Sequence, residues 1–219
     1  MFESLPDIPR LFTALAEWGA ALVYVVVVAR SASSNALNPH TAVPRWRLAA
    51  AACGGLAVLV GTQELLGHAP LSLWVPGMMT AYALMWGVIR VGTALDWRWV
   101  THMSARAFIV AELAASLAWQ VVVYSHADKP FWHPVSVAKY AAISATCLAV
   151  VYVCERRVVR QGALPVLRLA DLASAVIIGI AIFALSNLSF ISTATPFSGR
   201  AGWEVFYIRT LVDLAGYAI

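Results

Sequence analysis

Charged side chains that interrupt long apolar runs are the residues of this sequence best suited to chemistry. Arg106 and Glu112 lie inside one such run, and Arg209 and Asp213 lie inside the last. A charge at the centre of a membrane helix costs about 2.5–3.5 kcal/mol, so such groups are usually paired or functional. Arg209 and Asp213 are four residues apart and share a helix face, which allows an ion pair. That pair is either purely structural or part of a switch between two states.

The other polar groups in apolar runs have no partner at such close spacing. Arg106 and Glu112 are six residues apart, nearly two helical turns, and cannot bond directly. Gln63 and Glu64 end a second run, and Glu17 lies a turn or two into the first. Snorkelling of Glu17, Gln63 and Glu64 to the interface is favoured over a ligand or cation site. We retain Glu64, Arg106 and Glu112 as intramembrane polar candidates.

Neither a metal site nor a catalytic centre is expected in this chain. His126, Asp128 and His133 share the segment SHADKPFWHP, but they lack the helical spacing typical of metal ligands. A membrane cysteine peptidase would need His102 and Cys154 together at the inner face, and no local motif supports that pairing. We therefore assign no catalytic residue and expect no cofactor.

The composition is that of an integral membrane protein. Of 219 residues, 61% are hydrophobic and 12% are charged, whereas a soluble domain averages about 45–50% apolar and about 25% charged residues. The apolar excess covers the whole length, which excludes single-pass and peripheral proteins. The cysteines lie in or beside apolar runs, which excludes a secreted disulfide domain. The expected surroundings are a lipid bilayer, with no nucleic-acid partner.

The apolar runs predict an all-α, polytopic bundle of about seven transmembrane helices. Seven spans of about 20 residues take about 140 residues and leave only short connections. The first run is not a cleavable signal peptide, because Glu17 interrupts it. The predicted spans are 11–29, 48–66, 71–89, 104–124, 136–154, 172–190 and 205–219.

The distribution of Lys and Arg predicts the orientation of the bundle. Three alternate connections, 30–47, 90–103 and 155–171, carry nine arginines, whereas the opposite connections carry four cations. Because cationic loops stay in the cytoplasm, we expect the N-terminus outside and the C-terminus inside. The tryptophans agree with these spans. Those at or near span ends, where an aromatic ring lies at the membrane interface, are Trp46, Trp74, Trp97, Trp99, Trp132 and Trp203. Those within spans, Trp18, Trp86 and Trp119, are expected to pack between helices.

The C-terminal part carries three distinctive motifs, SNLSF at 186–190, TPFS at 195–198 and YIRTLVDL at 207–214. This segment resembles the end of the membrane sensor region in bacterial GHKL-type ATP-binding proteins, the histidine-kinase-like receptors related to accessory gene regulator quorum-sensing kinases. A weaker likeness covers about 90–124. In that family, a cytoplasmic dimerisation helix and an ATP-binding domain follow the sensor region.

The resemblance implies that residues 1–219 form one transmembrane sensor domain in the bacterial cytoplasmic membrane, acting as a homodimer. The last span has only fifteen residues and ends on an apolar residue, so we expect a longer protein that continues into the cytoplasm. Kinase chemistry would belong to that later part. An extracellular peptide or small amphipathic ligand would meet the outer hairpin, which is formed by the turn TPFS at 195–198 and the helix ends on either side of it. The expected ligand-binding or signalling residues are Asn187, Ser189, Phe197, Trp203, Tyr207, Arg209 and Asp213.

A small-molecule transporter, or the substrate-binding membrane subunit of one, is the alternative function. Size and embedded charges suit it equally well. The two functions are distinguished by the open reading frame after Ile219, because a sensor predicts a helical linker and a nucleotide-binding domain rich in Asn and Gly. A stop codon or a short polar tail favours transport.

The predicted orientation can be tested with an impermeant thiol reagent on intact cells. Cysteines introduced at Ser34 and Gly162 should be protected, because both positions lie in cation-rich connections. A cysteine at Ser198 should be labelled. Labelling at Ser34 would reverse the orientation.

Overall fold

The computed structural model describes residues 8–34, 43–125, 132–160, 167–191, 211–212 and 214–218. Every regular element in these ranges is a helix, which confirms the all-α class. The elements are α1 (Arg10–Ser34), α2 (Arg45–Ala49), the π-helical turn η2 (Ala50–Gly54), α3 (Gly55–Gly67), the 3-10 turn η3 (Leu71–Leu73), α4 (Trp74–Gly92), α5 (Trp97–Ser125), α6 (Pro134–Arg160) and α7 (Leu169–Ile191). Residues 211–212 and 214–218 are also helical, and we call this segment the last helix.

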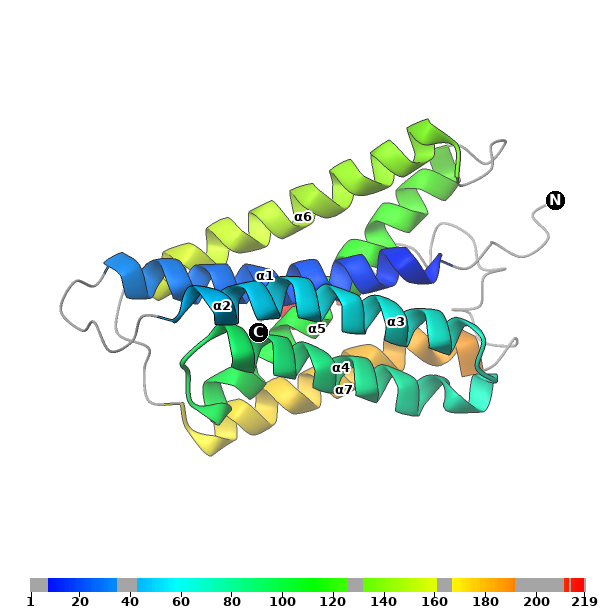
Figure 1. Cartoon of the computed structure of the whole chain (residues 1–219). Helices are drawn as coiled ribbons and strands as arrows, with labels where there is room; N and C mark the ends of the chain where they lie inside the picture. The colour runs from blue at the N-terminus through cyan, green and yellow to red at the C-terminus, as the bar shows by residue number, and fades with distance from the viewer. Residues whose placement is uncertain are drawn as a thin grey trace.

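The centre of the bundle is the pair α1 and α5, which make the most extensive contact of any two helices described. Helix α6 packs on both of them from one side, and α3 and α4 pack on α1 from the other (Figure 1). Helix α7 packs on α5. The main apolar core follows from this arrangement, because its buried side chains come mostly from α1, α4 and α5.

Four helical segments are long and apolar enough to cross a membrane: Arg10–Ser31, Arg45–Gly67, Trp97–Val122 and Pro134–Val159. Leu169–Ala184 is a shorter apolar helix. Large apolar side chains such as Leu65, Val158 and Ile177 are exposed, as expected of a surface that faces lipid. Six of the seven predicted spans coincide with helices of the structure. The count of seven spans and their orientation stay predictions.

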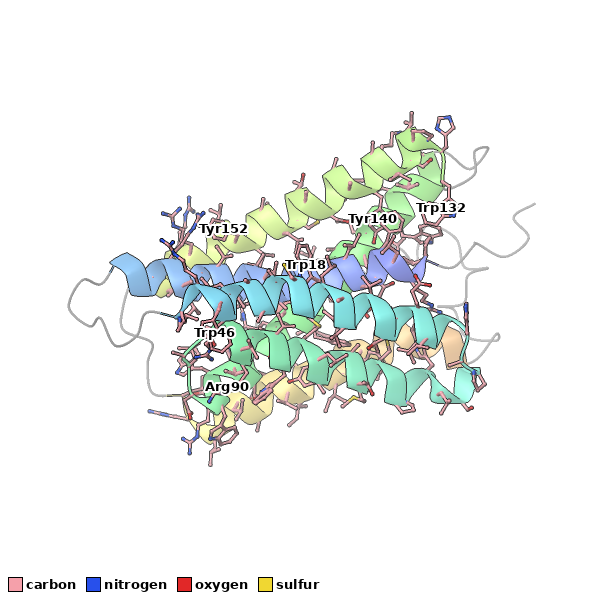
Figure 2. The ribbon with its side chains drawn as sticks, in the orientation of Figure 1. Trp18, Trp46, Arg90, Trp132, Tyr140 and Tyr152 are labelled. Atoms are coloured by element: carbon pink, nitrogen blue, oxygen red, sulfur yellow. The ribbon has the colours of Figure 1, made fainter. Side chains whose placement is uncertain are left out.

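Helix ends that carry arginines lie together at one end of the bundle, because Arg47 contacts the end of α4 and Arg30 contacts Tyr152 near the end of α6. Figure 2 shows Trp46, Arg90 and Tyr152 at this end, and Trp132 and Tyr140 at the opposite end. This grouping results from the alternating direction of successive helices, which returns the chain to the same end after each pair.

Arg47 closes the arginine-rich end by capping α4. Its side chain donates to the carbonyl oxygens of Val91 at 2.8 Å, Thr93 at 2.9 Å and Arg90 at 3.0 Å. The last carbonyl groups of a helix have no partner within the helix, and a cation there also opposes the helix dipole. Arg47 therefore fixes the start of α2 against the end of α4.

The tryptophans within spans pack between helices, as predicted. The Trp18 indole donates to the carbonyl of Ala52 at 2.8 Å, within the π-helical turn η2. A π-helical turn disturbs the regular hydrogen-bond ladder, and here one of its carbonyls is available to a neighbouring helix. Trp86 donates to the Thr101 hydroxyl at 3.0 Å, and Trp119 is buried beside Phe12.

Small residues allow the helices to approach closely. An ideal Cβ on Gly92 would lie 2.7 Å from both methyl carbons of Val25 and 3.2 Å from Cβ of Ala51. An ideal Cβ on Gly179 would lie 3.8 Å from Cβ of Ala105, so α7 contacts α5 through small residues. These close approaches are typical of helix packing in membranes.

Gly92→Ala should destabilise the bundle, whereas Gly87→Ala in the same helix should not. The added methyl at position 92 meets the stiff Val25 side chain and Ala51, and overpacking of this kind costs about 1–3 kcal/mol. Nothing lies within 4 Å of the corresponding point at Gly87, where alanine gains up to about 1 kcal/mol of helix propensity. Thermal unfolding of the two variants in detergent checks this, and equal melting temperatures would contradict the packing described.

Candidate functional site

One carboxylate oxygen holds together side chains from four segments. Oε1 of Glu155 accepts hydrogen bonds from Arg106 Nη2 at 3.0 Å and Nε at 3.2 Å. The same oxygen accepts from the Tyr24 hydroxyl at 3.0 Å and from the Tyr217 hydroxyl at 3.1 Å. The Arg106 guanidinium also lies over the Tyr217 ring, 4.8 Å from its centroid. We call these four residues the ionic cluster.

The members of the ionic cluster come from α1, α5, α6 and the last helix. Tyr24 and Glu155 are 1% and 7% exposed, so the carboxylate is almost removed from solvent. Arg106 is half-buried. A carboxylate in such surroundings is stable only with a cation and further donors around it, and Arg106 and the two tyrosines supply both.

A second set of polar contacts continues from the ionic cluster along α6. Tyr152, three residues before Glu155, accepts a hydrogen bond from Arg30 Nη1 at 2.6 Å. The Arg156 guanidinium lies 6.0 Å from the centroid of the same ring. Side chains three residues apart share a helix face. The ionic cluster is thus linked to the arginine-rich end of the bundle by one face of α6.

A buried amide and carboxyl pair lies two turns along α1 from Tyr24. Gln63 Nε2 donates to Glu17 Oε1 at 2.7 Å and approaches Met78 Sδ at 3.8 Å. Glu17 is 2% exposed and Gln63 is 0% exposed. The snorkelling predicted for these two residues is therefore wrong, because α3 and α4 cover this face of α1. Glu64, the neighbour of Gln63, is exposed.

An apolar cavity of about 350 Å³ lies between α4, α5 and α7. Its walls include Met78, Met79, Tyr82, Phe108, Gly179 and Phe183. Aromatic contacts organise one side, with the Phe108 ring 5.8 Å from Tyr82 and 5.6 Å from Phe183. Met78 links this cavity to the Gln63 amide.

The structure separates the predicted polar candidates. Arg106 bonds Glu155 on α6, whereas Glu112 lies close enough to Glu17 and to Tyr140 for its charge to act on both. Asn187 and Ser189 lie in α7, and their side chains are outside the described residues. The other predicted ligand-binding or signalling residues also lie outside the described residues: Phe197, Trp203, Tyr207, Arg209 and Asp213.

Sequence analysis missed Tyr24, Glu155 and Tyr217. Glu155 is followed by two arginines, and the predicted span ended at residue 154, so the carboxylate was assigned to a loop. Helix α6 in fact continues to Arg160 and carries Glu155 into the bundle. The sequence did contain a signal. Glu155 directly follows one apolar run, and Arg106 lies inside another run that offers it no acidic residue at ion-pair spacing.

His102 and Cys154, the two residues that a membrane cysteine peptidase would need together, have different surroundings in the structure. Cys154 is exposed, and His102 packs edge-on against Trp99 with ring centroids 5.7 Å apart. Among the described residues, no three His, Cys, Asp or Glu side chains come together as a metal ion would need.

Comparisons of the chain with protein-family models, with curated proteins and with solved structures found no match.

Glu155→Gln should destabilise the bundle strongly, because it leaves Arg106 without its counter-charge. Breaking a buried ion pair costs about 3–5 kcal/mol, equivalent to a fall of roughly 10 °C in melting temperature for a chain of this size. The double variant Arg106→Gln with Glu155→Gln should recover most of the loss. Thermal unfolding measures all three proteins, with Glu64→Gln as the exposed control. If Glu155→Gln and Glu64→Gln unfolded alike, the ion pair would carry no stability.

Proposed function

We propose that this chain is the membrane-embedded sensory domain of a bacterial histidine-kinase-like receptor. In this proposal, it relays an extracellular signal, carried by a peptide or small amphipathic ligand, to a cytoplasmic ATP-binding domain. Seven membrane spans, an outer N-terminus, the cytoplasmic membrane and a homodimeric state are parts of the same proposal. The residues of the outer hairpin, including Phe197 and Trp203, are its proposed ligand contacts.

The contacts of Tyr217 are the observation that carries this proposal. Tyr217 lies in the last helix, three residues after the end of the motif YIRTLVDL, and the resemblance expects the cytoplasmic part to continue from this element. Its hydroxyl donates to Glu155 and its ring stacks on Arg106. The neighbouring Gly216 packs against Ile178 and Ile182 of α7. A movement of α7 would therefore act on the last helix directly.

The ionic cluster has the energetics that a switch requires. A hydrogen bond to a charged acceptor contributes about 1.5–3 kcal/mol. If the last helix moved and Tyr217 left, Glu155 would keep Arg106 and Tyr24, so no bare charge would remain. Two helix arrangements would then differ by a few kcal/mol, a gap that a ligand with differential affinity can reverse.

A transporter is the second candidate, because buried charged groups in spans also mark ion and substrate pathways. The buried Glu17 and Gln63 pair is the observation that favours it. Transport requires that the substrate site is reached alternately from both sides of the membrane. Relay of a signal requires only a change in the position of the last helix.

Tyr217→Phe in the product of the complete gene tests the proposal. Loss of the hydroxyl removes one donor from Glu155 while the ring and the ion pair remain, so the protein should fold. We expect the basal rate of ATP-dependent phosphorylation in membrane vesicles to change about tenfold, the effect of about 1.4 kcal/mol on a two-state equilibrium.

Tyr152→Phe is the matched control, because it removes from α6 a tyrosine hydroxyl whose hydrogen-bond partner among the described residues is Arg30. Its basal rate should equal that of the parent. An unchanged rate in Tyr217→Phe would contradict the relay. A gene product that lacks an ATP-binding domain and accumulates solute in proteoliposomes would establish the transporter instead.

A further inference from the structure

Two oxygen atoms in the Glu17 and Gln63 pair lack a hydrogen-bond partner among the described residues. They are Oε2 of Glu17 and Oε1 of Gln63, and both are buried. Oε1 of Glu17 is satisfied by the Gln63 amide at 2.7 Å. Buried polar atoms are almost always hydrogen-bonded, so two orphaned acceptors within one hydrogen-bonded pair need an explanation.

One proton on Glu17 supplies the missing donor. A carboxylic acid and a carboxamide form a cyclic pair in which the amide N–H donates to one carboxyl oxygen and the carboxyl O–H donates to the amide oxygen. The first of these two bonds is present. The second joins the two orphaned atoms, so a single proton satisfies both. An ionised Glu17 has only acceptor atoms, so its Oε2 and the Oε1 of Gln63 would both remain without a donor.

The charges around Glu17 also favour its neutral form. Gln63 from α3 and Met78 from α4 carry no charge. The titratable groups on the other surrounding helices are Glu112 on α5 and Tyr140 on α6. Arg10, two turns earlier on α1, places its guanidinium over the Trp74 ring at 4.3 Å. A buried carboxylate beside another acidic group is disfavoured relative to the carboxylic acid.

We propose that Glu17 is a proton-binding site inside the bundle, and that its proton is held in a cyclic pair with Gln63 joining α1 to α3. Release of this proton places a bare charge between α1, α3 and α4. The contact between these helices therefore weakens as pH rises. This site does not depend on the proposed sensory function.

Infrared spectroscopy of the purified full chain in lipid nanodiscs tests the site without requiring a reagent to reach it. A protonated carboxylic acid has a carbonyl band separate from that of a carboxylate. At neutral pH, we expect a protonated-acid band that is lost in Glu17→Gln and retained in Glu64→Gln, which removes the exposed neighbouring acid. In Gln63→Leu the band should shift to higher frequency, because the acid loses its amide partner.

Thermal unfolding gives a second measurement. Protonated Glu17 stabilises the folded state, so the parent and Glu64→Gln should lose a few degrees of melting temperature as pH rises and the proton leaves. Glu17→Gln, which mimics the protonated acid, should lose less.

An infrared spectrum in which the parent and Glu17→Gln have the same protonated-acid band would overturn the proposal. A band that disappears when sodium replaces potassium would also overturn it, and would identify a sodium site.

Discussion

The bundle depends on the constraint that the Glu155 carboxylate must be neutralised inside an apolar structure. Its Oε1 accepts from Arg106, Tyr24 and Tyr217, so α5, α1 and the last helix each present a side chain to α6 at one level. A charge left bare there would cost several kcal/mol, more than most single contacts contribute. Arg106 and Tyr24 together prevent this, so they set how α5 and α1 are rotated toward α6, and Tyr217 adds a further donor from the last helix.

Apolar packing and helix capping adapt to that constraint. Small residues at the contacts of α4 with α1 and η2 allow the backbones to approach closely, as at Gly92 and Ala51. Arg47 then ties the end of α4 to α2. Glu17 and Tyr24 are seven residues apart, about 10 Å along one face of α1. This face thus carries both buried polar sites, one held by an ion pair and one, in our proposal, by a proton.

The sequence was sufficient for features that depend on local hydropathy. It predicted an all-helical chain, the positions of six helices, the packing of Trp18, Trp86 and Trp119, and the significance of Arg106.

The sequence was insufficient for contacts between polar side chains on different helices, because these contacts depend on how the helices rotate against one another. Glu155 was missed because its charge follows an apolar run and precedes arginines, so hydropathy placed it in a loop. The burial of Glu17 depends on α3 and α4 covering it, which α1 alone cannot indicate. Likewise, nothing in AAACG predicts the π-helical turn that offers a carbonyl to Trp18.

Glu155 holds the last helix against α6 through the Tyr217 hydroxyl. Spin labels at the exposed positions Val158 on α6 and Leu214 on the last helix measure this directly, in a chain whose three cysteines are replaced by serine. We expect a single narrow distance distribution in the parent background. Adding Glu155→Gln should broaden it and move it to longer distances, because Tyr217 loses its charged acceptor. Identical distributions in the two backgrounds would mean that Glu155 does not hold the last helix.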